Sequence, residues 1–139
     1  MLLLPIDRPL EAKTLSKQPG AGWEFESDYW KRPWGGAKDA SLADAVLGES
    51  EKFRALIQLF VDQPSLRATR DQLVKSLKTT SPGLGMSPRS VTGCRNKLGW
   101  NAFYVAQKRL NPISADKSGG PNAVWFMRPE AHAAFALVM

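Results

Sequence analysis

The side chains of this sequence that could do chemistry are mostly cations, and they gather in one stretch. Between Ser65 and Arg109 there are nine Lys or Arg residues and a single acid, Asp71. A basic stretch of this kind attracts polyanions, and its arginines and lysines can bind both phosphates and base edges. We therefore expect a nucleic-acid-binding surface here. The alternative is a surface that is only solvated by its charges.

Other chemistries have less support in the sequence. Glu24, Glu26 and Asp28 alternate with aromatic residues, and three carboxylates on one strand face could hold a metal or exchange protons. The same alternation is typical of the solvent-facing side of an antiparallel strand. His132 and Cys94 are the only residues of their types, so neither belongs to a recognisable ligand set. We expect a protein that is not an enzyme and has no metal site and no cofactor.

Length and composition indicate an ordinary globular protein. The chain has 139 residues, of which 43% are hydrophobic and 23% are charged, and this length supports one core with an appendage. We expect an N-terminal arm over residues 1–48 and one domain over residues 49–139. No apolar run approaches the ~18 residues that span a bilayer, and a single cysteine fits a reducing compartment. The sequence thus predicts a cytoplasmic protein that does not bind membranes.

Aromatic residues are the main feature of the N-terminal arm. The alternation from Trp23 to Trp30 predicts a short strand, and residues 41–47 have the pattern of a short helix that begins at a capping Ser41. Trp23, Trp30 and Trp34 lie near two cations, an arrangement that can stack on single-stranded bases. They can equally pack on the chain's own core or on a partner protein. We favour packing over stacking on bases, and we assign Trp23, Trp30 and Trp34 to partner binding.

Three helices are expected in the domain, with boundaries given by capping residues. Apolar spacing predicts helices over 50–63, 69–78 and 87–99. Ser87 suits the N-cap of the third helix, and Gly99 suits a left-handed terminator, although the aromatic residues after it could add a further helical turn or two. A strand over 123–127 and a last helix over 129–139 follow.

The third helix has an apolar face and a basic, polar face. At 100° per residue Val91, Cys94 and Leu98 form the inward stripe. The opposite face carries, with Arg95 at its edge, Arg89, Thr92, Gly93, Asn96 and Lys97. A glycine inside a helix costs about 1 kcal/mol relative to alanine. Gly93 on this face therefore indicates that something outside the helix approaches its backbone closely.

This order of elements resembles the winged helix-turn-helix family over about residues 50–130. The resemblance implies a mainly α fold with a small β component, preceded by the extended or β arm. It also implies a third helix in the major groove of DNA and a wing loop on the backbone. On that basis the residues that face base edges or phosphates are Arg89, Thr92, Asn96 and Lys97, and Gly93 allows the helix to approach the DNA closely. The remaining contacts to the DNA backbone come from Arg70, Lys75, Arg95 and, on the wing, Lys117.

The function expected from this resemblance is binding of double-stranded DNA, either sequence-specific or tolerant of sequence. Such a protein would act as a transcriptional regulator or as an accessory factor of a mobile element. The last helix, which carries Phe135, could pair with its counterpart in a symmetric homodimer. Two alternatives stay open: a protein-interaction module and a phage- or plasmid-type inhibitor. The sequence leaves open the DNA site, a preference for RNA and the oligomeric state.

Overall fold

The computed structural model describes residues 30–116 and 122–139, and the chain divides into two compact units, Met1–Lys31 and Arg32–Met139. The second unit is described below. It includes the 3-10 helix η2 (Gly36–Asp39) and the helix α3 (Ala40–Leu47), which pack on the last helix, α7 (Pro129–Ala136). The division falls after residue 31, whereas the sequence placed residues 32–48 in the arm.

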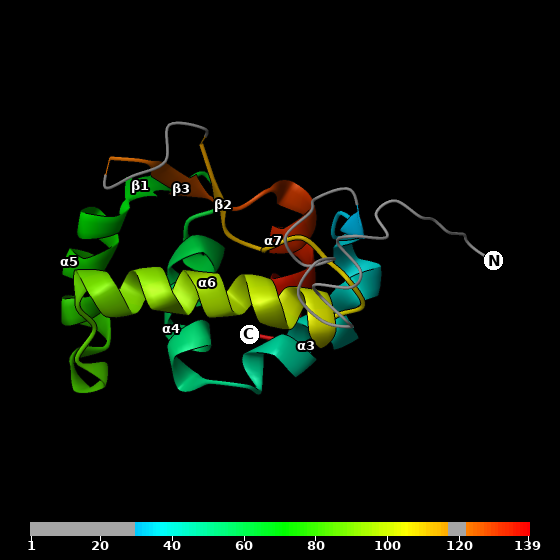
Figure 1. Ribbon diagram of the computed structural model, residues 1–139, viewed down its shortest axis with the longest axis horizontal. Coiled ribbons are helices and arrows are strands. Elements are labelled where there is room, and N and C mark those ends of the chain that lie inside the picture. The colour runs from blue at the N-terminus through cyan, green and yellow to red at the C-terminus, as the bar shows by residue number, and fades with distance from the viewer. Residues whose placement is uncertain (1–29, 117–121) are drawn as a thin grey trace, which may run out of the picture. The chain divides into compact units, whose positions relative to one another are not determined.

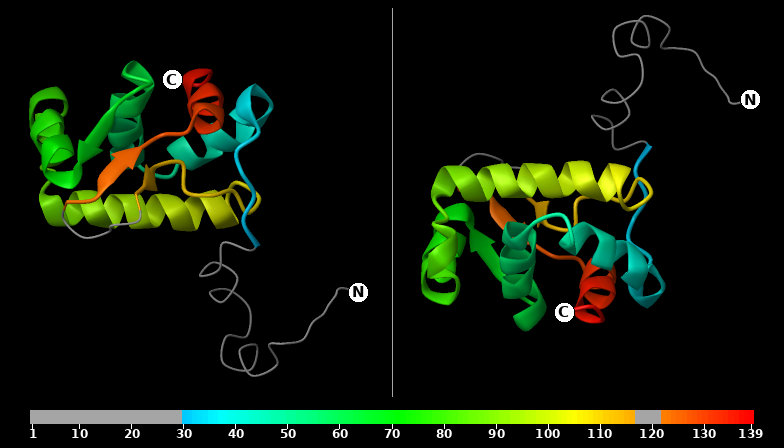
Figure 2. Two further views of the ribbon diagram at one scale, coloured as in Figure 1. Left: turned by 90° about the horizontal axis from the view of Figure 1, so that it is seen from above. Right: turned by 90° about the horizontal axis from the view of Figure 1, so that it is seen from below.

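Helices make up most of this unit (Figure 1). Three of them follow α3 along the chain: α4 (Glu51–Asp62), α5 (Arg70–Thr80) and α6 (Pro88–Tyr104), with the short 3-10 helix η3 (Pro82–Leu84) between the last two. Seen from above in Figure 2, α6 runs along one side of the unit and α7 lies on the opposite side. The mainly α fold class is confirmed.

A small antiparallel sheet completes the unit. Its strands are β1 (Arg67–Thr69), β2 (Ser114–Ala115) and β3 (Val124–Phe126), in the spatial order β1-β3-β2. The sequence predicted β3 but neither of the other two strands, because two or three residues are too few to show an alternating pattern. In β3 the side chain of Trp125 is buried while its neighbours are half-buried, so the sheet has one face on the core and one face outward.

The core is formed by the α-helices α3 to α7 and by the inner face of the sheet. Side chains that are completely or almost completely buried come from α3, α4, α5, α6 and α7. Burial of a large aliphatic or aromatic side chain is worth roughly 1.5–3 kcal/mol. The largest of these side chains are Phe60, Phe135, Leu56, Ile57, Leu73, Leu77 and Leu98.

Side-chain caps fix where the helices of the basic stretch begin. Thr69 and Gln72 form a capping box at the start of α5, and Ser87 and Ser90 form one at the start of α6. In each box the side chain of the N-cap residue accepts from the backbone N–H three residues later, and the side chain of that later residue accepts from the backbone N–H of the N-cap residue. Two N–H groups that would have no partner at a helix start are thereby satisfied. The predicted starts of these helices are confirmed. At α3 the prediction is wrong, because the N-cap is Asp39 and not Ser41.

The third helix does not end at Gly99 as expected. Gly99 is helical and buried, and α6 continues to Tyr104. A Cβ at Gly99 would lie 3.0 Å from Nδ2 of Asn111. That amide donates to the carbonyl of Arg95 at 2.9 Å, and its oxygen accepts from the N–H of Ile113 at 3.0 Å. Glycine is therefore needed here for the close approach of a side chain and not for a left-handed turn.

Left-handed residues do follow α6, but they are not glycines. Gln107 and Lys108 have φ values of 55° and 63°. The N–H of Lys108 donates to Phe103 O at 2.7 Å, and the N–H of Arg109 donates to Ala102 O at 3.0 Å. These bonds fold the chain back over the last carbonyls of the helix.

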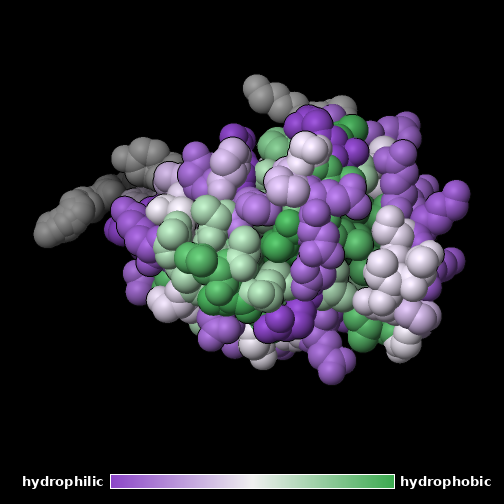
Figure 3. Space-filling model, turned by 180° about the vertical axis from the view of Figure 1, so that it is seen from behind, coloured by the Kyte–Doolittle hydropathy of each residue, from purple (hydrophilic) through white to green (hydrophobic). Residues whose placement is uncertain are grey.

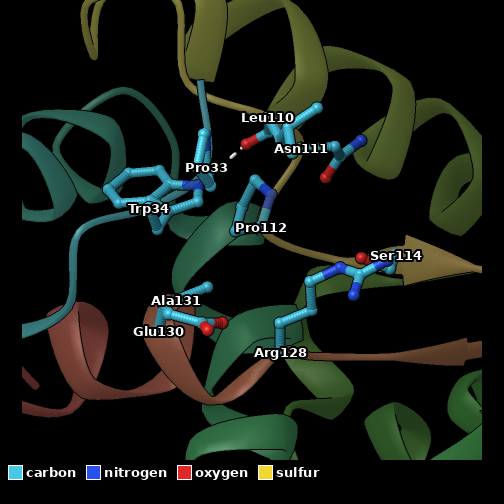
Figure 4. Close-up of a pocket in the computed structure, with 9 residues that line it drawn as sticks. All are labelled: Pro33, Trp34, Leu110, Asn111, Pro112, Ser114, Arg128, Glu130 and Ala131. Atoms are coloured by element: carbon cyan, nitrogen blue, oxygen red, sulfur yellow. Dashed lines mark hydrogen bonds between the residues drawn. The ribbon is translucent and has the colours of Figure 1, made fainter. Parts of the chain in front are cut away.

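The segment before η2 is joined to the loop after α6 by polar bonds. Trp34 is buried, and its Nε1 donates to the carbonyl of Leu110 at 2.8 Å (Figure 4). Its ring packs on that of Phe135, with centroids 4.9 Å apart. Asp39 accepts two bonds from Arg109, at 2.9 and 3.1 Å, and one from the N–H of Gly35 at 2.6 Å. The Arg109 guanidinium beside it holds the pKa of Asp39 below its usual range.

Candidate nucleic-acid interface

The outward face of α6 carries the residues that the sequence assigned to nucleic-acid contact. Arg89, Asn96 and Lys97 are exposed, and Thr92 and Gly93 are half-buried. The helix contains three cations and no acid over its 17 residues. Its core-facing side carries Val91, Cys94 and Leu98, which are buried as expected. The tertiary structure thus places these basic and amide side chains on one accessible surface.

A hollow of about 400 Å³ lies between this helix and the start of α4. Gly93 and Lys97 line it from α6, and Lys52 lines it from α4 together with the N-cap Ser50 and one acid, Glu49. The sequence assigned no role to Lys52, because it lies outside the basic stretch in the chain. Only the packing of α4 against α6 brings its amine to the same place as Lys97.

Gly93 opens into this space. A Cβ built at Gly93 meets nothing within 4 Å, so no contact within the described part of the chain requires a glycine there. The residue nevertheless lies in the middle of a helix, where alanine would be more stable by about 1 kcal/mol. The contrast with Gly99, where Asn111 fills the space, leaves room at Gly93 for a molecule outside the chain.

The thiol of Cys94 lies beneath the same hollow. It is 4% exposed, and burial raises its pKa to about 11, although Lys52 and Lys97 act in the opposite direction. A buried, protonated thiol is a poor nucleophile. Cys94 is therefore a packing residue here.

Arg95 has a role that the sequence did not predict. Its Nε donates to the carbonyl of Ile113 at 2.9 Å, and its guanidinium carbon lies 5.4 Å from the ring centroid of Trp125. The side chain is half-buried, and the loss of water lowers its pKa. These contacts join α6 to the sheet, so the geometry does not support the assignment of Arg95 to phosphate contact.

The other predicted backbone contacts have different surroundings. Arg70 is half-buried and its Nε lies 3.3 Å from Oδ1 of Asp71, which neutralises part of its charge. Lys75 is exposed on α5. Lys117 on the expected wing lies outside the described residues. Of these three, only Lys75 is shown with its charge open to solvent.

An exposed aromatic pair extends the outward face of α6 toward its end. Trp100 is 45% exposed, Tyr104 is 39% exposed, and their ring centroids are 4.4 Å apart. At 100° per residue both lie on the same side of the helix as Arg89 and Asn96. Sequence reasoning did not assign them to the site because it took Gly99 as the helix terminator and gave a further turn or two only as an alternative. The signal that could have found them is the continued spacing of 96, 100 and 104.

The residues assigned to partner binding are placed differently from the expectation. Trp34 and Phe135 are 4% and 0% exposed and pack on each other, so they stabilise the core and do not form a surface for a partner. Trp30 is half-buried in the first unit. Trp23 and the carboxylates of Glu24, Glu26 and Asp28 lie outside the described residues. Packing on the core, one of the three alternatives for these aromatic residues, is confirmed for Trp34.

Sites of other kinds receive no support from the part of the chain that the structure covers. Among residues 30–116 and 122–139, no three His, Cys, Asp or Glu side chains lie close enough to hold a metal ion. His132 contacts the carbonyl of Val61 through Nε2 at 3.1 Å and so links α7 to α4. No helix within these ranges has the length and apolar character needed to cross a bilayer.

Comparisons with protein-family models, with curated proteins and with solved structures find no match to this chain. The assignment of a function therefore depends on the geometry described above.

Proposed function

We propose that the unit Arg32–Met139 is a winged-helix domain that binds double-stranded DNA through the outward face of α6. The observation that carries the proposal is the exposure of Arg89, Asn96 and Lys97 on a capped, acid-free helix. In this proposal α6 enters the major groove, where arginine and asparagine can each make paired hydrogen bonds to bases. Lys97 and Lys52, on either side of the hollow, contact phosphates.

The order of elements also supports the proposal. α4, α5 and α6 are followed by two antiparallel strands, β2 and β3, and the loop between these strands corresponds to the wing of the family. Arg95 ties this hairpin to α6 through Ile113 and Trp125. The strands β2 and β3 and the recognition helix, joined in this way, would keep a fixed relation to each other when the protein binds DNA.

The test is a set of titrations of the protein against duplexes of different sequence, including a random-sequence duplex, in which fluorescence anisotropy measures binding at several salt concentrations. Lys97→Gln removes one phosphate contact, so we expect the slope of log affinity against log salt to become less negative by about 0.9. Arg89→Ala should reduce the discrimination between sequences. Arg54→Gln, an exposed arginine that lines a different hollow on α4, is the matched control. Unchanged slope and selectivity in both α6 variants would rule out this interface.

A second candidate function is binding of another protein, and a specific surface favours it. Figure 3 shows apolar side chains gathered on the face opposite to that of Figure 1. Leu137, which follows α7, is 63% exposed, and the next two residues in the chain, Val138 and Met139, are partly buried. Contiguous apolar surface of this kind can mark an interface. Binding to a partner that does not change with salt, together with no affinity for a duplex, would favour this function over the first.

A further inference from the structure

A cluster of two arginines and a phenylalanine lies on the outward face of the sheet, away from the side chains assigned above. The guanidinium carbon of Arg67 lies over the ring of Phe126, 4.4 Å from its centroid, and that of Arg128 lies 5.7 Å from the same centroid. The side chains of Arg67 and Arg128 are exposed, and that of Phe126 is half-buried. Cation–π contacts within about 6 Å are attractive, so the ring holds both charges in place.

The sheet register explains why these side chains meet. Arg67 in β1 and Ser114 in β2 lie directly opposite Phe126, one on each side of it. Trp125 and Met127 point to the core, so Phe126 and Arg128 lie on the other face. Figure 4 shows the side chain of Arg128 extending toward Ser114. β1 was absent from the expected structure, which is why sequence reasoning did not bring Arg67 and Arg128 together.

The charge of this cluster is not neutralised within the described part of the chain. Within residues 30–116 and 122–139 no ion pair is found for Arg67 or Arg128, and two cations that have one, Arg70 with Asp71 and Arg109 with Asp39, do not share it with them. Glu130 lines the same small hollow of about 30 Å³ as Arg128 but forms no ion pair with it. Two neighbouring guanidiniums repel each other, so an arrangement that holds them together favours the binding of an anion.

The two charges lie close enough together to contact one nucleic-acid backbone. The guanidinium carbons of Arg67 and Arg128 lie 4.4 and 5.7 Å from the same ring centroid, so they are at most 10.1 Å apart. Phosphates of one DNA strand follow each other at about 3.4 Å of rise, so two arginines this close can reach neighbouring phosphates of one strand. Arginine binds phosphate through two parallel N–H groups, and it can do so while it stacks on an aromatic ring.

We propose that Arg67 and Arg128, held over Phe126, form a second phosphate-binding site that contacts the sugar–phosphate backbone of the DNA bound by α6. This proposal rests on the proposed function. The sheet that carries the cluster is joined to α6 on its inner side, where the guanidinium of Arg95 packs on Trp125. The two surfaces therefore keep a fixed relation, and the second site would extend the footprint of the protein beyond the segment covered by α6.

The test is the salt dependence of duplex binding by the double variant Arg67→Gln/Arg128→Gln. Loss of two phosphate contacts should make the slope less negative by about 1.8, so the advantage of the wild type should be about 12-fold larger at 50 mM than at 200 mM salt. Arg67→Lys/Arg128→Lys keeps both charges and should restore most of the slope. Arg54→Gln is again the control. Thermal melts should show that all variants fold, because each exposed cation–π contact contributes little.

The outcomes separate this proposal from the proposed function. A normal slope in the double variant overturns the second site, whether or not the α6 variants lose affinity. A less negative slope in the double variant together with unchanged binding by Lys97→Gln keeps the second site and rejects the role of α6. A normal slope together with loss of binding to polyglutamate would assign the cluster to an acidic protein instead, and this also overturns the proposal.

Discussion

The two glycines inside α6 should respond to alanine in opposite ways. At Gly93 a Cβ meets nothing within 4 Å, so Gly93→Ala should gain the full helix propensity of about 1 kcal/mol. For a unit of this size that gain corresponds to a rise in Tm of about 4 °C. At Gly99 a Cβ would lie 3.0 Å from Nδ2 of Asn111.

The cost at Gly99 follows from the bonds that hold Asn111. Its amide group makes two hydrogen bonds, to the carbonyl of Arg95 and from the N–H of Ile113, and it cannot move away without weakening both. Each such bond contributes about 1 kcal/mol. The loss of about 2 kcal/mol exceeds the gain of about 1 kcal/mol in helix propensity, so Gly99→Ala should lower the free energy of unfolding by about 1 kcal/mol.

Urea denaturation followed by circular dichroism measures both changes, and the same proteins can be titrated with a duplex. If DNA approaches the helix at Gly93, the added methyl group should weaken binding about tenfold, as expected for an overpacked contact of 1–3 kcal/mol. The variant would then be more stable and bind less tightly. Destabilisation by Gly93→Ala would refute the account of this glycine as free of contacts. Unchanged affinity would refute the close approach.

Two further predictions concern buried polar groups. Asp39→Asn leaves the Arg109 guanidinium without its counter-charge and should cost about 3 kcal/mol at neutral pH. The pKa of Asp39 in the folded protein lies below its ordinary 3.8. The difference in the free energy of unfolding between the variant and the wild type should therefore be complete above pH 3.8 and should shrink as the pH falls through the folded pKa. A difference that does not depend on pH would contradict this prediction. Cys94, with its pKa raised to about 11 from 9.0, should have about 100-fold less thiolate than an open thiol. Its reaction with a thiol reagent at pH 8 should therefore be slow in the native protein and fast in urea, and equal rates would contradict the burial.

Capping residues allowed the helices of the basic stretch to be placed from the sequence. Thr69 with Gln72, and Ser87 with Pro88, act over three or four residues, so their effect does not depend on the rest of the fold. The same is true of the period that buries Val91 and Leu98 and exposes the opposite side of α6. Local signals of this kind also gave the approximate position of β3.

The short strands could not be predicted in this way. β1 and β2 have three and two residues and exist because β3 lies between them and supplies their hydrogen bonds. The sequence left the end of α6 open for a related reason. Gly99 matches a helix terminator in the sequence, but the helix continues to Tyr104, and Asn111, twelve residues later, occupies the space beside Gly99.

The sequence by itself determined that α6 is a helix with a basic, acid-free outer face, because capping and helical period depend on neighbours in the chain. Tertiary structure decided which cations share a surface. It placed Lys52 beside Lys97, directed Arg95 into the sheet and gathered Arg67 and Arg128 on one ring. The physical reason is that contacts between distant residues depend on how helices and strands pack, and no local pattern in the chain encodes that packing.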